Sequence, residues 1–378
     1  MSVEGRLRFE IAWDGARVAG VAVRSSRPLV AGRMLAGRTG REAVALLPKL
    51  YAICGHAQEA AAEQALACAE NRDTAEPDLR RRERRVLLET IEEYLLRLLV
   101  DLPVTLGRPG EAAALASLRR RLRRPQLLAS AIDESIAALA DEIEALVAVK
   151  VLDMAVEEWI ALDRSDSLRA WLDAGASACV EILRQLWNAS WDQAAPGLMP
   201  MPDGGAVLGF LAPAMESDPR FAHEPAWRGE VLETGALARQ QDHPLLRAAA
   251  AAGASRVALR LLARMVELVH LTERLRQQDA SANEDGWVQG ATVRPGVGVA
   301  WVQNARGLLL HWLETAGERI ARYVIVAPTE WNFHPRGAFV TGLVGMRVAN
   351  EADLRHRADL LARSLDPCVG FEIEVQHA

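Results

Sequence analysis

Two of the four cysteines lie in short segments where a thiol could take part in chemistry. Cys54 comes just before a predicted helix, and Gly55 after it allows the backbone to approach closely. A thiol near a helix N-terminus tends toward a lowered pKa, and the thiolate is the form that binds soft metals. Cys368 lies between Pro367 and Gly370, which mark a turn that could project the sulfur. Taken alone, each signal is weak, because a core cysteine beside a packing glycine is the commoner case.

The stretch 304–337 lies between these two cysteines and matches no generic core pattern. We expect its special residues in a loop that follows a strand. Such a density of special residues in a loop usually builds a functional site. They are Pro328, Thr329, Trp331, Asn332, Pro335 and Arg336.

The other two cysteines, Cys68 and Cys179, fall within apolar helical patterns. We expect both to be buried and inert. Four cysteines are too few for a disulfide framework, and the chain has no CxxC pair to bind zinc.

The composition excludes several classes of protein. Hydrophobic residues make up 50% and charged residues 25% of the 378 residues, as in ordinary globular domains, so wholesale disorder is excluded. The net charge of −6 argues against a nucleic-acid binder, which needs a basic face. We expect no membrane span, because no apolar run reaches about 18 residues. The charged N-terminus lacks the apolar stretch of a secretory signal, so we expect a cytoplasmic protein.

Arginine is concentrated in two runs, over residues 80–85 and 119–124. The favoured interpretation is a solvated helix edge. The alternative is a docking patch for an acidic protein surface.

The elements that must position the site are mostly helical. Apolar residues recur at helical spacing from Ile132 to Leu146, and the stretches 83–100, 166–190 and 255–277 show the same pattern. The stretch 196–215 is rich in Pro and Gly and is predicted to be a loop.

Short β elements are predicted near both ends of the chain. Alternating apolar residues around Asp14-Gly15 predict a hairpin over 6–24. After residue 286, the short stretches VQGATV, GVAWV and RYVIVA favour strands. A last helix is expected over about 350–364, followed by an alternating tail.

The fold class is therefore mainly α with small β elements (α+β). We expect a single domain over 1–378, without an internal repeat. It comprises the β-hairpin 6–24, a helical body over about 41–280 and a C-terminal β/loop site region over about 286–378.

Five short segments, in chain order, resemble motifs of the large subunit of nickel-iron hydrogenases. They span the two ends and the last fifth of the chain, and the helical middle adds length without motifs. The resemblance implies the fold of that subunit, with a large helical body. The matching segments are Ser2 to Arg8, Cys54 to Ala57, Gln303 to Gly307 with His311 and Trp312, Pro328 to Asn332 with Pro335 and Arg336, and Asp366 to Cys368.

The departures from that family bear most on function. Its large subunit holds nickel and iron with four cysteines, and the second cysteine of each pair bridges the metals; here those positions are Ala57 and Phe371. A binuclear site needs all four thiolates, so no nickel is expected and hydrogen turnover is not expected. The histidine that follows the first pair falls on Ala61. The resemblance therefore implies a protein that is not an enzyme.

The combination of retained and lost family residues resembles the HupK/HoxV group of hydrogenase accessory proteins, which are degenerate relatives of the large subunit. Cys54 and Cys368 match the first cysteine of each pair. The resemblance implies a maturation scaffold that transiently carries the Fe(CN)2CO unit, or an intermediate, for delivery to the large subunit. Cys54 and Cys368, with His56, are the predicted iron ligands. Arg306 and Thr329, with Pro328 before it, are the predicted cofactor-binding residues, because a cyanide nitrogen accepts hydrogen bonds.

The partners implied by this resemblance are a HypC-type small maturation chaperone, a HypD-type assembly protein and the hydrogenase large-subunit precursor. Three other functions stay open. The first is a shape-mimicking protein chaperone in hydrogenase assembly that binds no cofactor. The second is an enzyme with a mononuclear iron site, and the third is a helical binding module unrelated to hydrogenases.

Two further expectations concern the ends of the chain. Glu4 matches a family glutamate placed for proton movement, and a structural carboxylate is the better interpretation without turnover. In the family a protease removes a tail after the histidine that here is Glu374. Only four residues follow, so we expect the working protein to end at Ala378.

Overall fold

The computed structural model describes most of the chain as two compact units. The first comprises Met1–Val86, Gln193–Gly235 and Ala282–Ala378, and the second comprises Leu87–Asp192 and Ala236–Ser281. All predicted site residues from Cys54 to Cys368 lie in the first unit. Glu4 and Ala378 lie outside the described residues, and the single-domain interpretation stays a prediction. The described residues are 5–26, 30–51, 53–122, 133–162, 164–187, 195–277 and 286–377.

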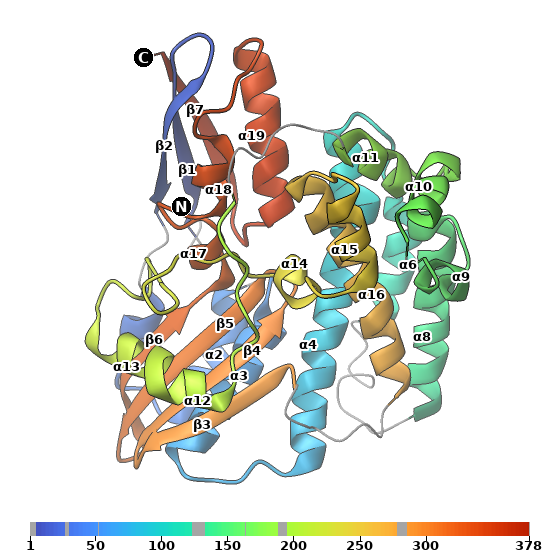
Figure 1. Cartoon of the computed structure of the whole chain (residues 1–378). Coiled ribbons are helices and arrows are strands. Elements are labelled where there is room, and N and C mark those ends of the chain that lie inside the picture. Colours follow the sequence, from blue (N-terminus) through green and yellow to red (C-terminus); the bar gives the residue numbers. More distant parts are fainter. Residues whose placement is uncertain are drawn as a thin grey trace. The chain divides into compact units, whose positions relative to one another are not determined.

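The described residues of the first unit form seven strands in two sheets, with helices packed against them (Figure 1). The last part of this unit supplies five of those strands. In chain order its elements are β1 (Leu7–Trp13), β2 (Val18–Ser25), α1 (Val30–Leu35), α2 (Gly40–Leu50), α3 (Gly55–Ala69), the start of α4 (Glu76–Leu96), α12 (Gly204–Ala206), the π-helix η3 (Val207–Leu211), α13 (Ala212–Ser217), β3 (Val288–Arg294), β4 (Val297–Asn304), β5 (Gly307–Ala316), β6 (Arg319–Val326), α17 (Pro328–Asn332), α18 (Ala338–Leu343), α19 (Glu351–Leu365) and β7 (Phe371–His377).

The smaller sheet, ordered β2-β1-β7, joins the two ends of the chain. Strands β1 and β2 form the predicted hairpin, and β7 pairs with β1 in parallel, with Leu7 opposite Phe371. The alternating apolar residues of β1 are buried, and Phe9 stacks on Phe339 with ring centroids 4.0 Å apart. The hairpin and the strand over the tail are confirmed. The pairing brings the segment after Cys368 beside the start of the chain.

The larger sheet is an antiparallel meander, β3-β4-β5-β6, with a hydrophobic core on each face. Helices α1, α2 and α3 cover one face, where Leu47, Ala65 and Leu313 meet. The segment with α12 and α13 covers the other face, where Leu211 and Trp312 meet (Figure 1). Strand β5 was not among the predicted strands. Its residues from Gly307 to Leu313 are all buried, so the alternation that reveals a half-exposed strand is absent.

The predicted loop 196–215 is wrong in its second half. Asp203 accepts a hydrogen bond from the backbone N–H of Ala206 and so begins the helical segment from α12 to α13. Pro213 lies inside this continuous segment, directly after the π-helix η3, and Gly204 lies at its start. The Pro and Gly residues of the stretch are thus not confined to a loop.

The second unit is helical, as predicted for the middle of the chain. The stretch 166–190, predicted to be helical, contains two helices in its described part, which ends at residue 187, because Gly175 leaves the helical conformation with a ψ of 139°. The elements of the second unit are the rest of α4, the π-helix η1 (Arg97–Asp101), α5 (Leu102–Thr105), α6 (Ala112–Leu122), α8 (Asp133–Val147), the π-helix η2 (Ala148–Leu152), α9 (Val156–Ile160), α10 (Ser165–Ala174), α11 (Ala178–Trp187), α14 (Ala236–Arg239), α15 (Pro244–Ala251) and α16 (Arg256–Arg276).

The described helices include none with both the length and the apolar character needed to span a bilayer.

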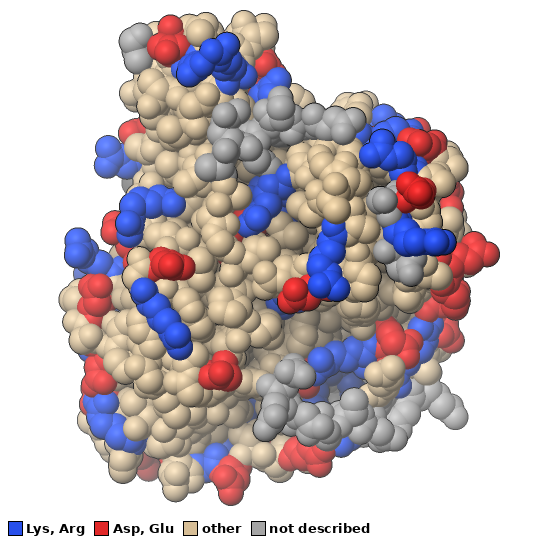
Figure 2. Space-filling view, viewed as in Figure 1, with Lys and Arg blue, Asp and Glu red and all other residues tan. Residues whose placement is uncertain are grey.

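The arginine runs make contacts within the protein. Arg82 and Arg85 are mostly buried, and both bond to Glu63, which ties α4 to α3. In the second run, Arg119 bonds to Glu92 at 2.6 Å. The interpretation of the first run as a solvated edge is therefore wrong for its buried members. On the face shown in Figure 2, Lys and Arg alternate with Asp and Glu rather than gathering into one basic field.

Candidate functional site

Cys54 is the N-cap residue of α3 and is 7% exposed. One turn later, the Gln58 side-chain amide donates a hydrogen bond to Cys54 Sγ, with Nε2 and Sγ 3.7 Å apart. The cysteine therefore lies at a helix N-terminus, as the sequence predicted, and its sulfur accepts a hydrogen bond from an uncharged donor.

Small residues allow α3 to lie very close to the larger sheet. The alanines on its inner face, including Ala57 and Ala65, are fully buried. Opposite them is Gly298 in β4, where an added Cβ would lie 2.0 Å from the backbone oxygen of Ala65. The alanine-rich sequence of α3 and this glycine together fix the height of the helix above the sheet, and so the position of Cys54.

A buried polar chain continues from Gln58 under the helix. The Gln58 Oε1 lies 2.9 Å from His311 Nε2, and His311 Nδ1 lies 2.9 Å from the hydroxyl of Tyr323. His311 is fully buried in β5, and burial lowers its pKa to about 3, so the ring is neutral. His311 was quoted from the sequence only as part of a motif, and Gln58 and Tyr323 were not singled out.

Cys368 follows α19 and is also buried, at 8% exposed. The Thr329 hydroxyl donates to Cys368 Sγ at 3.1 Å and accepts from the Cys368 backbone N–H at 3.3 Å. Pro328 is the first residue of α17 and sets Thr329 in its first turn. The sequence assigned the Thr329 hydroxyl to diatomic ligands of iron, whereas the structure directs its single proton to the cysteine.

Arg306 lies in the tight connection between β4 and β5, and its side chain is 2% exposed. Its Nε is 3.5 Å from Oδ2 of Asp366, which is equally buried and lies two residues before Cys368. The backbone of Arg306 is fixed as well, because Asn304 Oδ1 accepts from its N–H and Asn332 donates to its carbonyl. A rigid, buried positive charge therefore contacts the segment that carries Cys368.

Asp366 was quoted as part of a motif without a role, and the structure gives it one. It has a left-handed backbone, with a φ of 54°, and ends α19. Its carboxylate balances the Arg306 guanidinium in a place that water does not reach.

Replacing Asp366 with asparagine should lower the free energy of unfolding by about 3 kcal/mol, because it leaves the buried Arg306 charge without its carboxylate. Asparagine tolerates the left-handed conformation, so the backbone is not strained. Urea unfolding of the variant measures this. The matched control is Asp153→Asn, an exposed aspartate with a φ of 52°, which should change stability by less than about 0.5 kcal/mol. Equal effects of the two changes would contradict the pairing.

His56 does not lie with the two cysteines as a set of three. Its Nδ1 is 3.8 Å from Oε2 of Glu59, and its side chain is 40% exposed. Contact with His56 lowers the pKa of Glu59, which also bonds to Arg85 at 2.8 Å. Within the described ranges, no three His, Cys, Asp or Glu side chains are placed to hold one metal ion. The role of His56 as a third ligand stays a prediction.

The positions of the family's bridging cysteines are filled by packed side chains. Ala57 is fully buried within α3. Phe371 lies at the start of β7, with its ring 5.5 Å from that of Phe9 and 5.6 Å from the Arg363 guanidinium. Glu374 pairs with Arg8 across the smaller sheet at 3.5 Å. Phe371 and Glu374 thus have contacts within the smaller sheet, and neither Ala57 nor Phe371 supplies a thiolate.

Cys68 and Cys179 lie in different surroundings from the two predicted ligands. Cys179 donates its S–H to the Leu98 carbonyl at 3.2 Å, and burial raises its pKa to about 12. Burial also raises the pKa of Cys68. Both thiols are therefore protonated at neutral pH. Cys179 is buried, as predicted, whereas the prediction that Cys68 is buried is wrong, because Cys68 is only half-buried.

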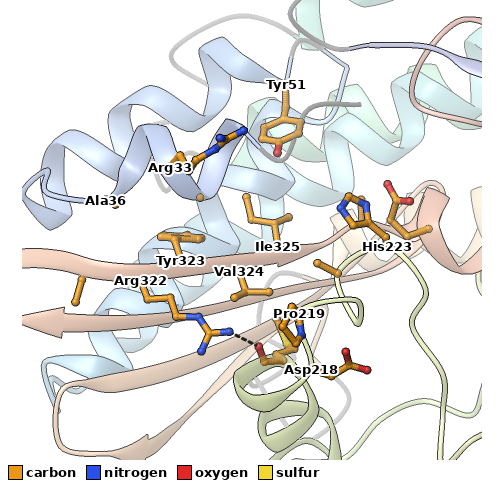
Figure 3. Close-up of a pocket in the computed structure, with 16 residues that line it drawn as sticks. Arg33, Ala36, Tyr51, Asp218, Pro219, His223, Arg322, Tyr323, Val324 and Ile325 are labelled. Atoms are coloured by element: carbon orange, nitrogen blue, oxygen red, sulfur yellow. Dashed lines mark hydrogen bonds between the residues drawn. The ribbon is translucent and has the colours of Figure 1, made fainter. Parts of the chain in front are cut away.

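A pocket of about 660 Å³ borders β6, and Figure 3 shows its lining. None of the predicted site residues lines it, although Ala327 and Glu330, which flank Pro328 and Thr329, do. Arg33 extends toward Tyr51 at one side, and Arg322 donates to the backbone oxygen of Met215. The pocket is therefore adjacent in sequence to the Thr329 segment and distinct from the cysteines.

The sequence of the chain is similar to those of several known proteins. The nickel-dependent hydrogenase family model matches residues 243–372. The chain is 33% identical to the hydrogenase expression/formation protein HoxV of Cupriavidus necator, over 99% of this chain and 96% of that protein. It is 30% identical to the hydrogenase expression/formation protein HupK of Bradyrhizobium diazoefficiens, over 100% of this chain and 99% of that protein.

Solved structures confirm the predicted fold. The nickel-iron-selenium hydrogenase of Desulfovibrio vulgaris Hildenborough is similar, with a TM-score of 0.63, 16% identity and 93% of each chain covered. The corresponding enzyme of Desulfomicrobium baculatum gives a TM-score of 0.63 at 15% identity, with 94% of each chain covered. The fold is that of a hydrogenase large subunit, mainly α with small β elements, as the motifs implied.

Proposed function

The chain belongs to the family of hydrogenase expression/formation proteins that includes HoxV and HupK, and from this premise we propose that it transiently carries an Fe(CN)2CO unit, or an intermediate of it, to the hydrogenase large subunit. It acts in hydrogenase maturation. The iron unit is its cargo, and the proposal includes no catalytic turnover, because Ala57 and Phe371 replace the bridging thiolates.

One observation carries the proposal. Cys54 and Cys368 come from opposite ends of the chain, and each is buried with its sulfur accepting a hydrogen bond from a neutral side chain. The other two cysteines differ from this pair. Cys179 donates its S–H to the Leu98 carbonyl, and Cys68, whose sulfur accepts from an amide at 4.0 Å, is only half-buried. Two thiolates hold a metal less firmly than four, which suits a protein that must release it.

The surrounding residues have distinct proposed roles. Thr329 holds the Cys368 sulfur through its hydroxyl, and Pro328 sets that residue at the start of α17. Arg306 presents a fixed positive charge, balanced by Asp366, toward the anionic cyanide ligands. His56 joins as a third donor only if its ring turns away from Glu59.

A transfer assay tests the proposal. The protein is isolated with radioactive iron from cells that contain an intact maturation pathway, then mixed with purified large-subunit precursor. Iron should move to the precursor together with its cyanide and carbonyl ligands. A HypC-type chaperone and a HypD-type assembly protein are the proposed donors, and they should load the empty protein. Iron that stays with the chain, or a chain that never acquires it, would contradict the carrier role.

The second candidate is a shape-mimicking chaperone that binds no cofactor. It is favoured by the likeness to the large subunit over 93% of both chains and by the lack of a three-donor cluster among the described residues. Such a protein would bind assembly proteins through its surface, and Cys54 and Cys368 would be dispensable for maturation.

Replacing Thr329 with valine should weaken retention of the iron unit by about 10–100-fold, as is typical for residues that hold a metal ligand. Valine keeps the shape and removes only the hydroxyl that contacts Cys368. Thr329→Ser should restore retention. Iron content after serial dilution measures the effect. The control is Thr341→Val in α18, which removes a hydroxyl that donates a hydrogen bond to the Gly337 carbonyl. Equal loss in the serine and valine variants would exclude the hydroxyl as the cause.

A further inference from the structure

Cys54 is the first member of a four-residue hydrogen-bonded chain that crosses from α3 into the larger sheet. The chain runs from Cys54 to Gln58, then to His311 in β5 and Tyr323 in β6. All four side chains are at most 7% exposed. Gln58 and His311 are 253 positions apart in the sequence, so the fold alone brings them together.

The chemistry of each group fixes the direction of every bond in this chain. The Gln58 amide nitrogen donates to Cys54, which leaves only the amide oxygen, an acceptor, for His311. His311 therefore carries its proton on Nε2. Its ring is neutral, so Nδ1 has no proton and accepts from the Tyr323 hydroxyl. The result is a one-way chain that ends with a donor aimed at the Cys54 sulfur.

From this geometry we infer that Gln58, His311 and Tyr323 are positioning residues that hold the Cys54 sulfur in one orientation for the iron unit. This inference rests on the proposed function. Tyr323 fixes the His311 tautomer, His311 fixes the Gln58 amide, and Gln58 fixes the sulfur. Thr329 does the same for Cys368 in a single step. Partners of metal ligands commonly orient them in this way.

Helix α3 contains a matched pair for comparison. Gln64 also directs its side-chain amide to a cysteine, Cys68, at 4.0 Å. Its amide oxygen accepts from Arg82 and Thr74 rather than from a buried histidine. Cys68 is not a predicted ligand. Gln64→Leu is therefore the control for Gln58→Leu, because both remove an amide of the same size from the same helix.

The first measurement uses the full-length protein without iron. Three-bond couplings of cysteines labelled with carbon-13 and nitrogen-15 report the side-chain torsion of Cys54. A single rotamer is expected in the unmodified protein and in Gln64→Leu, and an average over several rotamers is expected in Gln58→Leu. Tyr323→Phe, a milder change, should give partial averaging. A fixed Cys54 rotamer in both Gln58→Leu and Tyr323→Phe would overturn the inference.

The second measurement uses iron-loaded protein and infrared spectroscopy. An N–H···S hydrogen bond withdraws electron density from the sulfur, so its loss makes the thiolate a stronger donor to iron and strengthens back-donation to carbonyl. Gln58→Leu should therefore move the carbonyl band to lower wavenumber. Because the sulfur is then no longer held in one orientation, iron retention should also weaken by about 10–100-fold. Gln64→Leu should leave the band in place. An unshifted band in Gln58→Leu would overturn the inference while leaving the carrier role intact.

The two failures are distinguishable. Absence of metal-bound carbonyl and cyanide bands in the unmodified protein would contradict the proposed function. The rotamer measurement does not depend on iron. It would then still decide whether Gln58, His311 and Tyr323 position the Cys54 sulfur.

Discussion

Replacing Gly298 with alanine should displace α3 from the larger sheet and abolish the site. The new Cβ would lie 2.0 Å from the Ala65 carbonyl oxygen and 2.6 Å from the Ala69 nitrogen. Both are backbone atoms of α3, so no side-chain rotation relieves the clash, and the helix that begins at Cys54 must move. We expect a loss of at least about 3 kcal/mol, the upper end of the overpacking range, together with loss of iron binding.

Thermal and urea unfolding measure the loss of stability. Gly20→Ala in β2 is the control, because nothing lies within 4 Å of its added Cβ. That variant changes the backbone entropy in the same way and creates no clash. If Gly298→Ala and Gly20→Ala were equally stable, the close packing of α3 on β4 would be wrong.

Replacing either Cys54 or Cys368 with alanine should remove the iron unit completely while preserving the fold. Each sulfur is one of only two proposed thiolate ligands, so the remaining thiolate has no second anchor. The measurement is iron content per chain, with the melting temperature taken on the same sample. The stability change should be well below the about 2–5 kcal/mol that a buried Leu→Ala costs.

Cys68→Ala and Cys179→Ala are the matched controls. Both remove a thiol of the same size, and both thiols have raised pKa values because of burial. These variants should keep their iron. Loss of iron in all four variants would indicate a general effect on folding, and its retention in Cys54→Ala would favour the shape-mimicking chaperone.

The sequence predicted the elements whose residues alternate or repeat at one clear spacing. The hairpin of β1 and β2, the long helix α16 and strand β7 all show such patterns. Strands β4 and β5 are both buried on both faces, so neither alternates. The valines of β4 still indicated a strand, whereas β5 is rich in leucine, which carries no such signal. The break at Gly175 and the helical turns after Asp203 depend on local backbone contacts that periodicity does not report.

The candidate site was predictable where motifs preserve residue types. Cys54, Cys368, Arg306 and Thr329 were found in this way. Their partners were not, because those contacts depend on pairing between distant segments. Gln58 is unremarkable within an alanine-rich helix, and only the placement of α3 on β5 reveals its bond to His311.

Infrared spectroscopy with elemental analysis, on protein purified from a host with an intact maturation pathway, tests the central claim most directly. Metal-bound carbonyl and cyanide absorb where protein does not. The carrier role predicts both kinds of band, one iron per chain and no equimolar nickel, since Cys54 and Cys368 alone remain of the four expected ligands. Protein without these bands, or with nickel equal to iron, would contradict it.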